Sequence, residues 1–155
     1  MGIFDKFFKK KKYEGEVVSL IESYRVDEKT SFDGVPTVYY DVISNSDNKK
    51  VGSIDLRLTV EGFMYYYGHV GYNIIKQYRG NNYAYYACKV LFKIAHDEFN
   101  MDELIITCSP ENIASYKILT KLGGQIVELV DVPSDHTLYR LGEKKKYIFK
   151  FDNTL

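Results

Sequence analysis

The sequence predicts a single α/β domain. Its 155 residues are about the length of one domain, and a chain of this size can enclose a hydrophobic core without metals or disulfides. Segments with the composition of strands fill most of the first half, and two segments with helical periodicity follow. We see no internal repeat and no linker between them.

The first half of the chain is predicted to be β-rich. Between Glu14 and Asp27 the apolar spacing suits a helix while the β-branched content suits a strand, and we favour the strand. A polar turn region covers Lys29–Pro36, and the turn at Asn45–Lys50 predicts a hairpin. The predicted strands are Glu14–Asp27, Thr37–Ser44, Val51–Thr59 and Tyr65–Ile75, the last interrupted by Gly68 and Gly71.

Two helices and three further strands are predicted in the second half. The first helix carries one apolar stripe, formed by Ala84, Cys88, Leu91 and Ala95. The second is expected to begin with Ser109 as its N-cap and Pro110 at its first position, and to end at Gly123-Gly124. The predicted helices cover Asn81–Glu98 and residues 109–122; the strands are Leu104–Thr107, Gln125–Asp131 and Lys146–Phe151, with an irregular stretch at Val132–Lys145.

Composition narrows the class of function. Lys plus Arg and Asp plus Glu both number 21, so the net charge is zero and the basic excess of a nucleic-acid-binding domain is missing. Cys88 and Cys108 form no CxxC pair and have no His at metal-ligand spacing, which indicates reduced thiols and no metal site. No apolar run reaches the length of a membrane span. We therefore expect a cytoplasmic protein without a metal.

The first twelve residues differ from the rest. Residues 1–12 hold five Lys against Asp5, which is a net charge of +4 and leaves −4 for the remaining chain. Ile3, Phe4, Phe7 and Phe8 would share one face of a short helix, an arrangement suited to weak contact with an anionic membrane surface. The alternative is a frayed tail. We expect a basic amphipathic tail at 1–12 and a single domain at 13–155.

A strand, a turn and a helix follow one another between Gly71 and Ala84. A sharp turn at Gly80 would leave successive backbone N–H groups pointing outward at the helix N-terminus. Arg79 would add a charge-assisted contact. This predicts an anion site suited to a pyrophosphate. The alternative is a tight turn without a ligand, since many such turns contain Arg-Gly.

Two segments resemble motifs of the GNAT (GCN5-related) N-acetyltransferase family. Gln77 to Ala84 resembles the Q/R-x-x-G-x-G/A turn that grips the pyrophosphate of acetyl-coenzyme A, with Asn82 where Gly or Ala is usual. Asn112 to Gly124 resembles the segment N-x-x-(A/S)-x-x-x-Y-E-K-x-G-F, and it follows a short buried strand as that family requires. The resemblance covers Pro36–Phe151 and also points to a poorly characterised bacterial subgroup.

The resemblance implies a fold and an activity. The fold would be a mixed, mostly antiparallel central sheet flanked by helices, with splayed parallel central strands. The family's usual helices between its first two strands have little room in residues 14–36. The activity would move an acetyl group from acetyl-CoA to a primary amine by direct transfer in a ternary complex. The partners would be acetyl-CoA and an unidentified amine, with a homodimer as a further possibility that the many tyrosines suggest.

The same resemblance implies a set of coenzyme contacts. Backbone groups around Ile74 would pair with the pantetheine arm like an added strand, and the turn before the helix would hold the pyrophosphate. The sulfur end would lie where the strands at 65–75 and 104–107 splay apart. The implied contacts are Asn73, Ile74, Ile75, Gln77, Arg79, Gly80, Asn81, Asn82, Tyr83, Ala84, Asn112 and Ser115.

Transfer to an amine needs a base for the ammonium and an acid for the leaving thiolate. His69 is our candidate base, because a histidine titrates near neutral pH, and a hydrogen-bonded structural role is the alternative. Asp55 and Glu61 are fallbacks that would work through water, although a solvated surface carboxylate is the simpler interpretation of Asp55. His96 is expected at the surface, while His136 and Tyr139 could line an acceptor pocket.

The acid is predicted from the second helix. The position that aligns with the family's tyrosine is Leu119, which cannot donate a proton. Tyr116 lies three residues earlier on the same helical face and is our candidate, with a packing role as the alternative. Cys108 ends the buried strand, and we interpret it as a small buried hydrophobe rather than a nucleophile. Leu119 and Asn82 also support a second hypothesis, a non-catalytic acyl-CoA-binding sensory or regulatory module.

Overall fold

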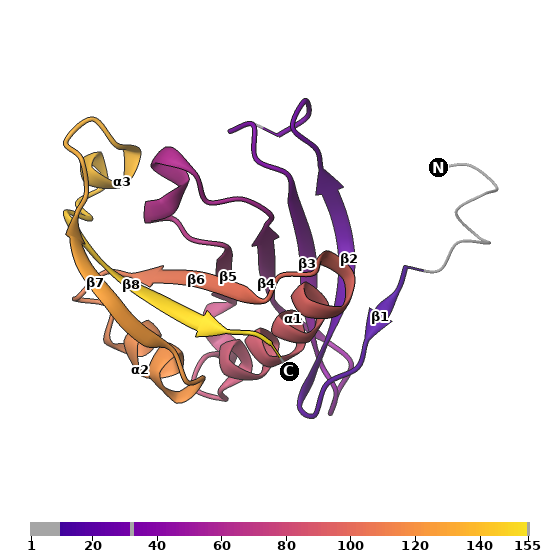
Figure 1. Cartoon of the computed structure of the whole chain (residues 1–155). Helices are drawn as coiled ribbons and strands as arrows, with labels where there is room; N and C mark the ends of the chain where they lie inside the picture. Colours follow the sequence, from indigo (N-terminus) through magenta and orange to yellow (C-terminus); the bar gives the residue numbers. More distant parts are fainter. Residues whose placement is uncertain (1–9, 32, 155) are drawn as a thin grey trace.

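The computed structural model describes residues 10–31 and 33–154, which form two antiparallel sheets and the helices between them (Figure 1). The first sheet has the order β1 (Lys12–Tyr13), β2 (Val18–Val26), β3 (Thr37–Ser44), β4 (Lys50–Arg57) and β5 (Val70–Ile74). The second has the order β6 (Glu103–Cys108), β8 (Lys145–Asp152) and β7 (Gln125–Asp131). This confirms the mixed fold with mostly antiparallel sheets and flanking helices.

Helices join and cover the sheets. The long helix α1 (Tyr83–Phe99) connects the two sheets and packs against β2, β4 and β5. Its predicted stripe is confirmed, because Ala84, Cys88, Leu91 and Ala95 are all buried. The helix ends where Asn100 takes a left-handed conformation with φ 53°. The shorter helix α2 (Ile113–Lys121) follows β6 and buries Leu119 completely. Among the described residues, no helix is both long and apolar enough to cross a membrane.

The strand predictions for the first hairpin are confirmed closely. β3 has the predicted bounds, and the ambiguous segment before it forms the strand β2. Val18 and Leu20 on β2 are fully buried against the core, and the strand pairs with both β1 and β3. Pairing on both edges therefore decides between the two periodicities that this segment carries.

The predicted strand at 65–75 is wrong in its first half. Residues Gly62–Tyr66 form a short 3₁₀ helix, η2, and the strand β5 begins only at Val70. Gly68 has φ +74°, a left-handed conformation that interrupts the extended chain. The tyrosines at 65–67 favour a strand by composition, but the local turn at Gly68 prevents an extended chain there.

The start of α2 and the stretch after β7 also differ from the predictions. The N-cap is Asn112 and not Ser109, because Asn112 Oδ1 accepts a hydrogen bond from the backbone N–H of Ser115 at 3.1 Å. Ser109 Oγ instead donates to Glu143 at 2.8 Å. The stretch expected to be irregular contains the one-turn helix α3 (Thr137–Arg140), which lies next to η2 in Figure 1.

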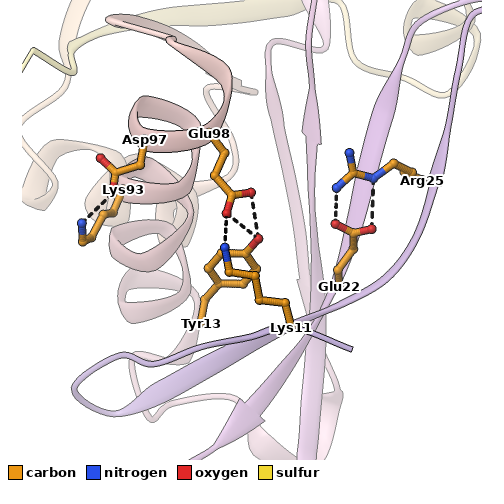
Figure 2. A network of polar contacts seen from close by, with 7 residues as sticks. All are labelled: Lys11, Tyr13, Glu22, Arg25, Lys93, Asp97 and Glu98. Carbon is orange, nitrogen blue, oxygen red and sulfur yellow. Dashed lines mark hydrogen bonds and ion pairs between the residues drawn. The ribbon is translucent and has the colours of Figure 1, made fainter. Parts of the chain in front are cut away.

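The end of the predicted tail is attached to the domain. Lys11 Nζ lies 2.5 Å from Glu98 on α1, and the Tyr13 hydroxyl donates to the same carboxylate at 2.8 Å (Figure 2). These contacts lower the pKa of Glu98, with the Lys11 hydrogen bond as the largest cause. Lys12 in β1 pairs with Ile21 in β2. Residues 1–9, which carry the predicted apolar face, lie outside the described residues.

The two sheets meet at one narrow junction. β5 and β6 share no ladder, and their backbones are linked in the described residues only by the bridge between Gly68 and Ile106 and by the His69 N–H, which donates to Ile105 O at 2.7 Å. A Cβ built on Gly68 would lie 2.8 Å from Ile105 O. Beyond this point the described residues of β5 and β6 share no further pairing, which agrees with the expectation that the central strands splay apart.

Gly68→Ala is expected to lower the free energy of unfolding by about 2–3 kcal/mol, because a left-handed alanine is strained and its Cβ would press on Ile105. Gly62→Ala is the matched control: Gly62 has φ +61°, and a Cβ added there would meet nothing within 4 Å, so this change should cost only about 1 kcal/mol. Urea unfolding of both variants measures the difference. Equal losses would show that the contact at the junction adds nothing to the strain.

Candidate functional site

A cleft opens where β5 diverges from the second sheet. It has a volume of about 540 Å³, within the range of small-molecule sites, and lies between β5, the N-terminus of α1 and the N-terminal half of α2. Its lining residues are Tyr72, Asn73, Ile74, Tyr78, Arg79, Gly80, Asn82, Tyr83, Ala84, Asn112, Ala114, Ser115, Lys117 and Ile118. Two segments about thirty residues apart thus face one cavity.

Most of the predicted coenzyme contacts line this cleft. They are Asn73, Ile74, Arg79, Gly80, Asn82, Tyr83, Ala84, Asn112 and Ser115. Ile75, Gln77 and Asn81 do not line it, and the Asn81 amide is used to hold the turn by donating to Tyr78 O at 2.9 Å. Tyr72 and Lys117 line the cleft without having been predicted from the sequence. Tyr72 could have been found from strand alternation, because it lies two residues before Ile74 on the same strand. Lys117 could have been found from its position in the first turns of α2.

The turn before α1 supplies exposed backbone N–H groups. Gly80 has φ +91° with nothing near the position of a Cβ, and Asn82 is left-handed at φ 60°. The Asn82 side chain caps no N–H of the helix. The first hydrogen bond of the helix runs from Tyr86 N–H to Asn82 O, so the amides of Tyr83 and Ala84 have no partner inside the helix. Together with the helix dipole they favour an anion here.

The left-handed turn also gives a reason for the motif departure at Asn82. Asparagine is the residue that adopts positive φ most readily after glycine. The position therefore keeps the backbone shape of a glycine while adding an amide at the rim of the cleft. The departure from the usual Gly or Ala leaves the geometry of the turn intact.

Arg79 lies in the wall of the cleft. Its side chain is anchored to the strand, because Nε donates to Ile74 O at 3.0 Å. Within the part of the chain that the structure describes, no hydrogen bond or ion pair uses the other guanidinium N–H groups. A charged donor group is thus held beside the unpaired amides of α1.

The open edge of β5 offers fewer groups than the sequence predicts. Ile75 N–H donates to Val51 O at 2.9 Å, and Asn73 is opposite Ser53 in the same ladder. Hydrogen bonding alternates along an edge strand. The backbone N–H and C=O groups of Ile75 and Asn73 therefore point toward β4, while those of Tyr72 and Ile74 point toward the cleft. Of the three backbone positions expected to pair with pantetheine, only Ile74 has its groups on the open edge, and its carbonyl already accepts a hydrogen bond from Arg79 Nε.

Tyr72 spans the cleft between its two walls. Its hydroxyl donates to Ser115 Oγ on α2 at 2.9 Å, and burial is the largest cause of a raised pKa for this phenol. The bond connects β5 of the first sheet with the helix that follows β6. Tyr72 is therefore a neutral donor inside the cleft at ordinary pH.

His69 is held at the junction by both its backbone and its ring. Its Nδ1 accepts the backbone N–H of Ile105 at 2.9 Å, and the residue is only 9% exposed. Burial lowers the pKa of the ring to about 4. With that lone pair committed, the neutral ring carries its proton on Nε2 and can only donate. These contacts suit the structural alternative for His69 better than the role of base.

The predicted acid, Tyr116, does not line the cleft. The Tyr116 ring packs against Tyr147 and Phe149 at centroid distances of 5.6 and 5.8 Å, and 36% of the residue is exposed. Its neighbours on α2, Ser115 and Lys117, line the cleft whereas Tyr116 does not. Leu119 is completely buried in the core, so a proton donor at that position would have no access to a ligand.

The other candidates have distinct surroundings. His136 is buried and holds η2, with Nε2 2.8 Å from Phe63 O and Nδ1 accepting Leu138 N–H. His96 is paired with Asp97 at 3.0 Å. Cys108 is 3% exposed and burial raises its thiol pKa, which disfavours a thiolate nucleophile. Among the described residues, no group of three or more His, Cys, Asp or Glu could hold a metal.

Asp55 is not the solvated carboxylate that its strand position indicates. Its side chain is 19% exposed, and Arg57 Nη2 lies 3.4 Å from Oδ2. Burial raises the pKa of this carboxyl, and the charge of Arg57 opposes the shift. Glu61, the other fallback, is exposed at the start of η2.

The sequence model of the acetyltransferase (GNAT) domain family matches residues 5–125. A curated relative, the uncharacterized N-acetyltransferase YnaD of Bacillus subtilis (strain 168), is 32% identical over 65 residues. That alignment covers 39% of this chain and 38% of YnaD, so the similarity spans well under half of either protein.

Solved structures share the fold. A GNAT-family acetyltransferase from Bacillus anthracis superposes with a TM-score of 0.67 at 16% identity, covering 92% of this chain and 99% of the other. The microcin C7 self-immunity acetyltransferase MccE, solved in complex with acetyl-CoA and AMP, gives 0.59 at 13% identity over 75% of this chain and 61% of its own. At these identities the likeness concerns the fold.

His69→Gln is expected to reduce the pH dependence of stability. In the wild type, the folded ring protonates near pH 4 and an unfolded ring near 6.5, so the free energy of unfolding should rise between these pH values, by on the order of 3 kcal/mol in total. A glutamine can still accept the Ile105 N–H but does not titrate. Urea unfolding at pH 4.5 and pH 7 measures the slope, and an unchanged slope would show that another group produces it.

Proposed function

This chain belongs to the GNAT acetyltransferase family, and we propose that it transfers an acetyl group from acetyl-CoA to a primary amine. The observation that carries the proposal is the cleft, where the unpaired amides at the start of α1, Arg79 and the open edge of β5 converge. Arg79 and the amides belong to the first motif and β5 directly precedes it, while the second motif contributes Asn112 and Ser115 to the lining of the same cleft. We also propose that the transfer is direct, within a ternary complex, and that the acceptor is a primary amine.

The residues present fit acetyl-CoA. Its diphosphate needs several N–H donors and positive potential, which the turn at Gly80 and the N-terminus of α1 supply. The space above Gly80 is clear to 4 Å. Its pantetheine arm needs a strand-like edge, which Tyr72 and Ile74 supply. When bound, acetyl-CoA supplies an activated thioester.

The chain's own groups would act in sequence along this cleft. Arg79 and the amides of Tyr83 and Ala84 hold the diphosphate end. Ile74 would offer its backbone groups on the open edge of β5 to the pantetheine arm. A tyrosine then gives a proton to the leaving thiolate, either Tyr116 as the sequence predicts or Tyr72, whose hydroxyl lies in the cleft.

The alternative is a non-catalytic module that binds acyl-CoA. The absence of a hydroxyl at Leu119 favours it, because the family's usual donor position is buried core here. Both hypotheses require coenzyme binding, and only the enzyme releases thiol in the presence of an amine. Calorimetric titration with acetyl-CoA and free CoA, followed by a thiol-release assay with a panel of primary amines, separates them. No binding at millimolar coenzyme would refute both.

Arg79→Ala is expected to weaken acetyl-CoA binding about 10- to 100-fold, the effect of one charge-assisted hydrogen bond to a diphosphate. Lys93→Ala is the matched control, because it also removes one positive charge. Lys93 is paired with Asp97 and lies in the second half of α1, away from the cleft. Calorimetry measures both dissociation constants. Unchanged affinity in Arg79→Ala would remove this residue from the diphosphate site.

Tyr72→Phe is expected to lower kcat about 10²-fold, because its hydroxyl lies inside the cleft and can donate to the thiolate. Tyr116→Phe makes the same chemical change on a ring that packs outside the cleft. We expect the smaller effect from Tyr116→Phe, measured as thiol release under saturating acetyl-CoA. The reverse order would assign the acid to Tyr116, and two unaffected variants would leave water as the proton source.

A further inference from the structure

A row of facing residues crosses the first sheet on the side opposite α1. The ladder pairs Tyr24 with Tyr39, Tyr39 with Asp55, and Asp55 with Gly71, so one row runs from β2 to β5. The inward-facing neighbours Tyr40, Ile54 and Leu56 are buried in the core under α1. The row therefore lies on the outer face, which α1 does not cover.

Asp55 is the unusual member of this row. Neither of its carboxylate oxygens accepts a hydrogen bond from the described residues, and Oδ2 is inaccessible to solvent. The ion pair with Arg57 Nη2 at 3.4 Å lacks hydrogen-bond geometry. Carboxylates that are mostly buried normally have hydrogen-bond donors around them. Within the described chain Oδ2 has only the charge of Arg57 beside it, and Oδ1 accepts no hydrogen bond from a protein group.

Gly71 places that carboxylate over β5. A Cβ built on Gly71 would lie 2.9 Å from Asp55 Oδ1 and 3.1 Å from Arg57 Nη2. The carboxylate thus occupies the space that any side chain at residue 71 would take. Oδ1 is the oxygen that remains accessible, and it lies directly above the strand that forms one wall of the cleft.

With acetyl-CoA held as proposed above, its acetyl end would lie beside this point. The groups proposed to hold the diphosphate lie at the start of α1, beyond Ile74, and the two sheets touch at His69. Between the start of α1 and His69, the residues of β5 that line the cleft are Tyr72, Asn73 and Ile74. Gly71 and Asp55 occupy the same stretch of the sheet on its outer face.

We propose, resting on the acetyltransferase function above, that Asp55 takes the proton of a primary alkylammonium acceptor that reaches the thioester over Gly71 from the outer face. The stacked rings of Tyr24 and Tyr39, 4.4 Å apart, extend the row and suit the apolar part of an organic cation. Arg57 lies over Gly71 beside the carboxylate, with Nη2 3.4 Å from Asp55 Oδ2, and its Nη1 donates to Gly68 O at 3.1 Å.

The proposed step conserves atoms and charge. The ammonium loses one proton to Asp55 Oδ1, and the freed nitrogen forms the C–N bond with the acetyl carbon. The C–S bond breaks, and the second nitrogen proton passes to the leaving thiolate through the tyrosine of the cleft. Asp55 then returns its proton to solvent, so that one ammonium and one thioester give one amide, one thiol and one proton.

The pH dependence follows from the surroundings of Asp55. Burial raises its pKa, Arg57 on the same strand lowers it, and Asp33 in the loop before β3 raises it. Tyr39 faces it from β3, and Gly71 on β5 adds no charge. Asp55 must be ionised to accept a proton, so activity should rise with pH through this raised pKa, which lies closer to neutral than that of an ordinary aspartate.

The test compares Asp55→Asn and Gly71→Ala with the wild type and with Asp41→Asn. Asp41 is a matched control on β3, where its carboxylate is already paired with Lys50 at 2.9 Å. Acetyl-CoA affinity is measured by calorimetry. Thiol release is measured from pH 5 to pH 9 with butylamine, tyramine and alanyl-glycine amide as acceptors, and the thermal midpoint is recorded for every variant.

We expect Asp55→Asn to keep its acetyl-CoA affinity while kcat/KM for the amine falls roughly 10²- to 10⁴-fold and the acidic limb disappears. Its thermal midpoint should be unchanged or higher, because a raised folded-state pKa means that the ionised carboxylate opposes folding at neutral pH. Gly71→Ala should lower the same rate by displacing Oδ1 without changing its chemistry. Asp41→Asn should match the wild type.

Three results would overturn the assignment. Wild-type rates and an intact acidic limb in Asp55→Asn would refute it while leaving the acetyltransferase function in place. Coenzyme binding without thiol release from any of the three amines would refute a primary alkylammonium acceptor and favour the binding module. No coenzyme binding by the wild type would refute the proposed function itself, a failure that the calorimetry separates from the other two.

Discussion

The contact between Gly68-His69 and Ile105-Ile106 determines how the rest of the molecule is arranged. It is the point where a five-stranded and a three-stranded sheet touch without sharing a ladder. The His69 ring takes the place of a backbone carbonyl by accepting the Ile105 N–H, so this link ends after one residue instead of continuing as a strand pair. Because pairing stops here, β5 keeps an open edge, and the cleft exists along that edge.

The same junction connects the two faces of the first sheet. Arg57 N–H donates to His69 O at 2.7 Å and its guanidinium donates to Gly68 O, so one residue of β4 fastens the turn from the outer side. Its partner Asp55 is thereby held over Gly71. The contacts of Arg57 with Gly68 and His69 hold the junction between the sheets. They also place the Asp55 carboxylate one strand away from the proposed position of the thioester.

The sequence is most informative where local chemistry alone sets the structure. The hairpin of β3 and β4, the apolar stripe of α1 and the turn at Gly80 follow from residue type and spacing, and most predicted cleft residues lie where expected. Roles that depend on pairing partners could not be predicted in the same way. The use of His69 Nδ1 by Ile105, and of Ile75 N–H by Val51, depends on which strand lies opposite each residue.

Asp55 shows why burial is the hardest property to infer. Alternation along β4 places it on the polar face with Ser53 and Arg57, and that face is outward as predicted. The pattern cannot reveal that the neighbouring position across the ladder is a glycine, so that the carboxylate folds over β5 and leaves solvent. Because Gly71 on β5 has no side chain, the carboxylate of Asp55 on β4 can lie over it and is largely buried. The proposed chemistry therefore depends on a pair of residues, Asp55 and Gly71, of which only one carries a functional group.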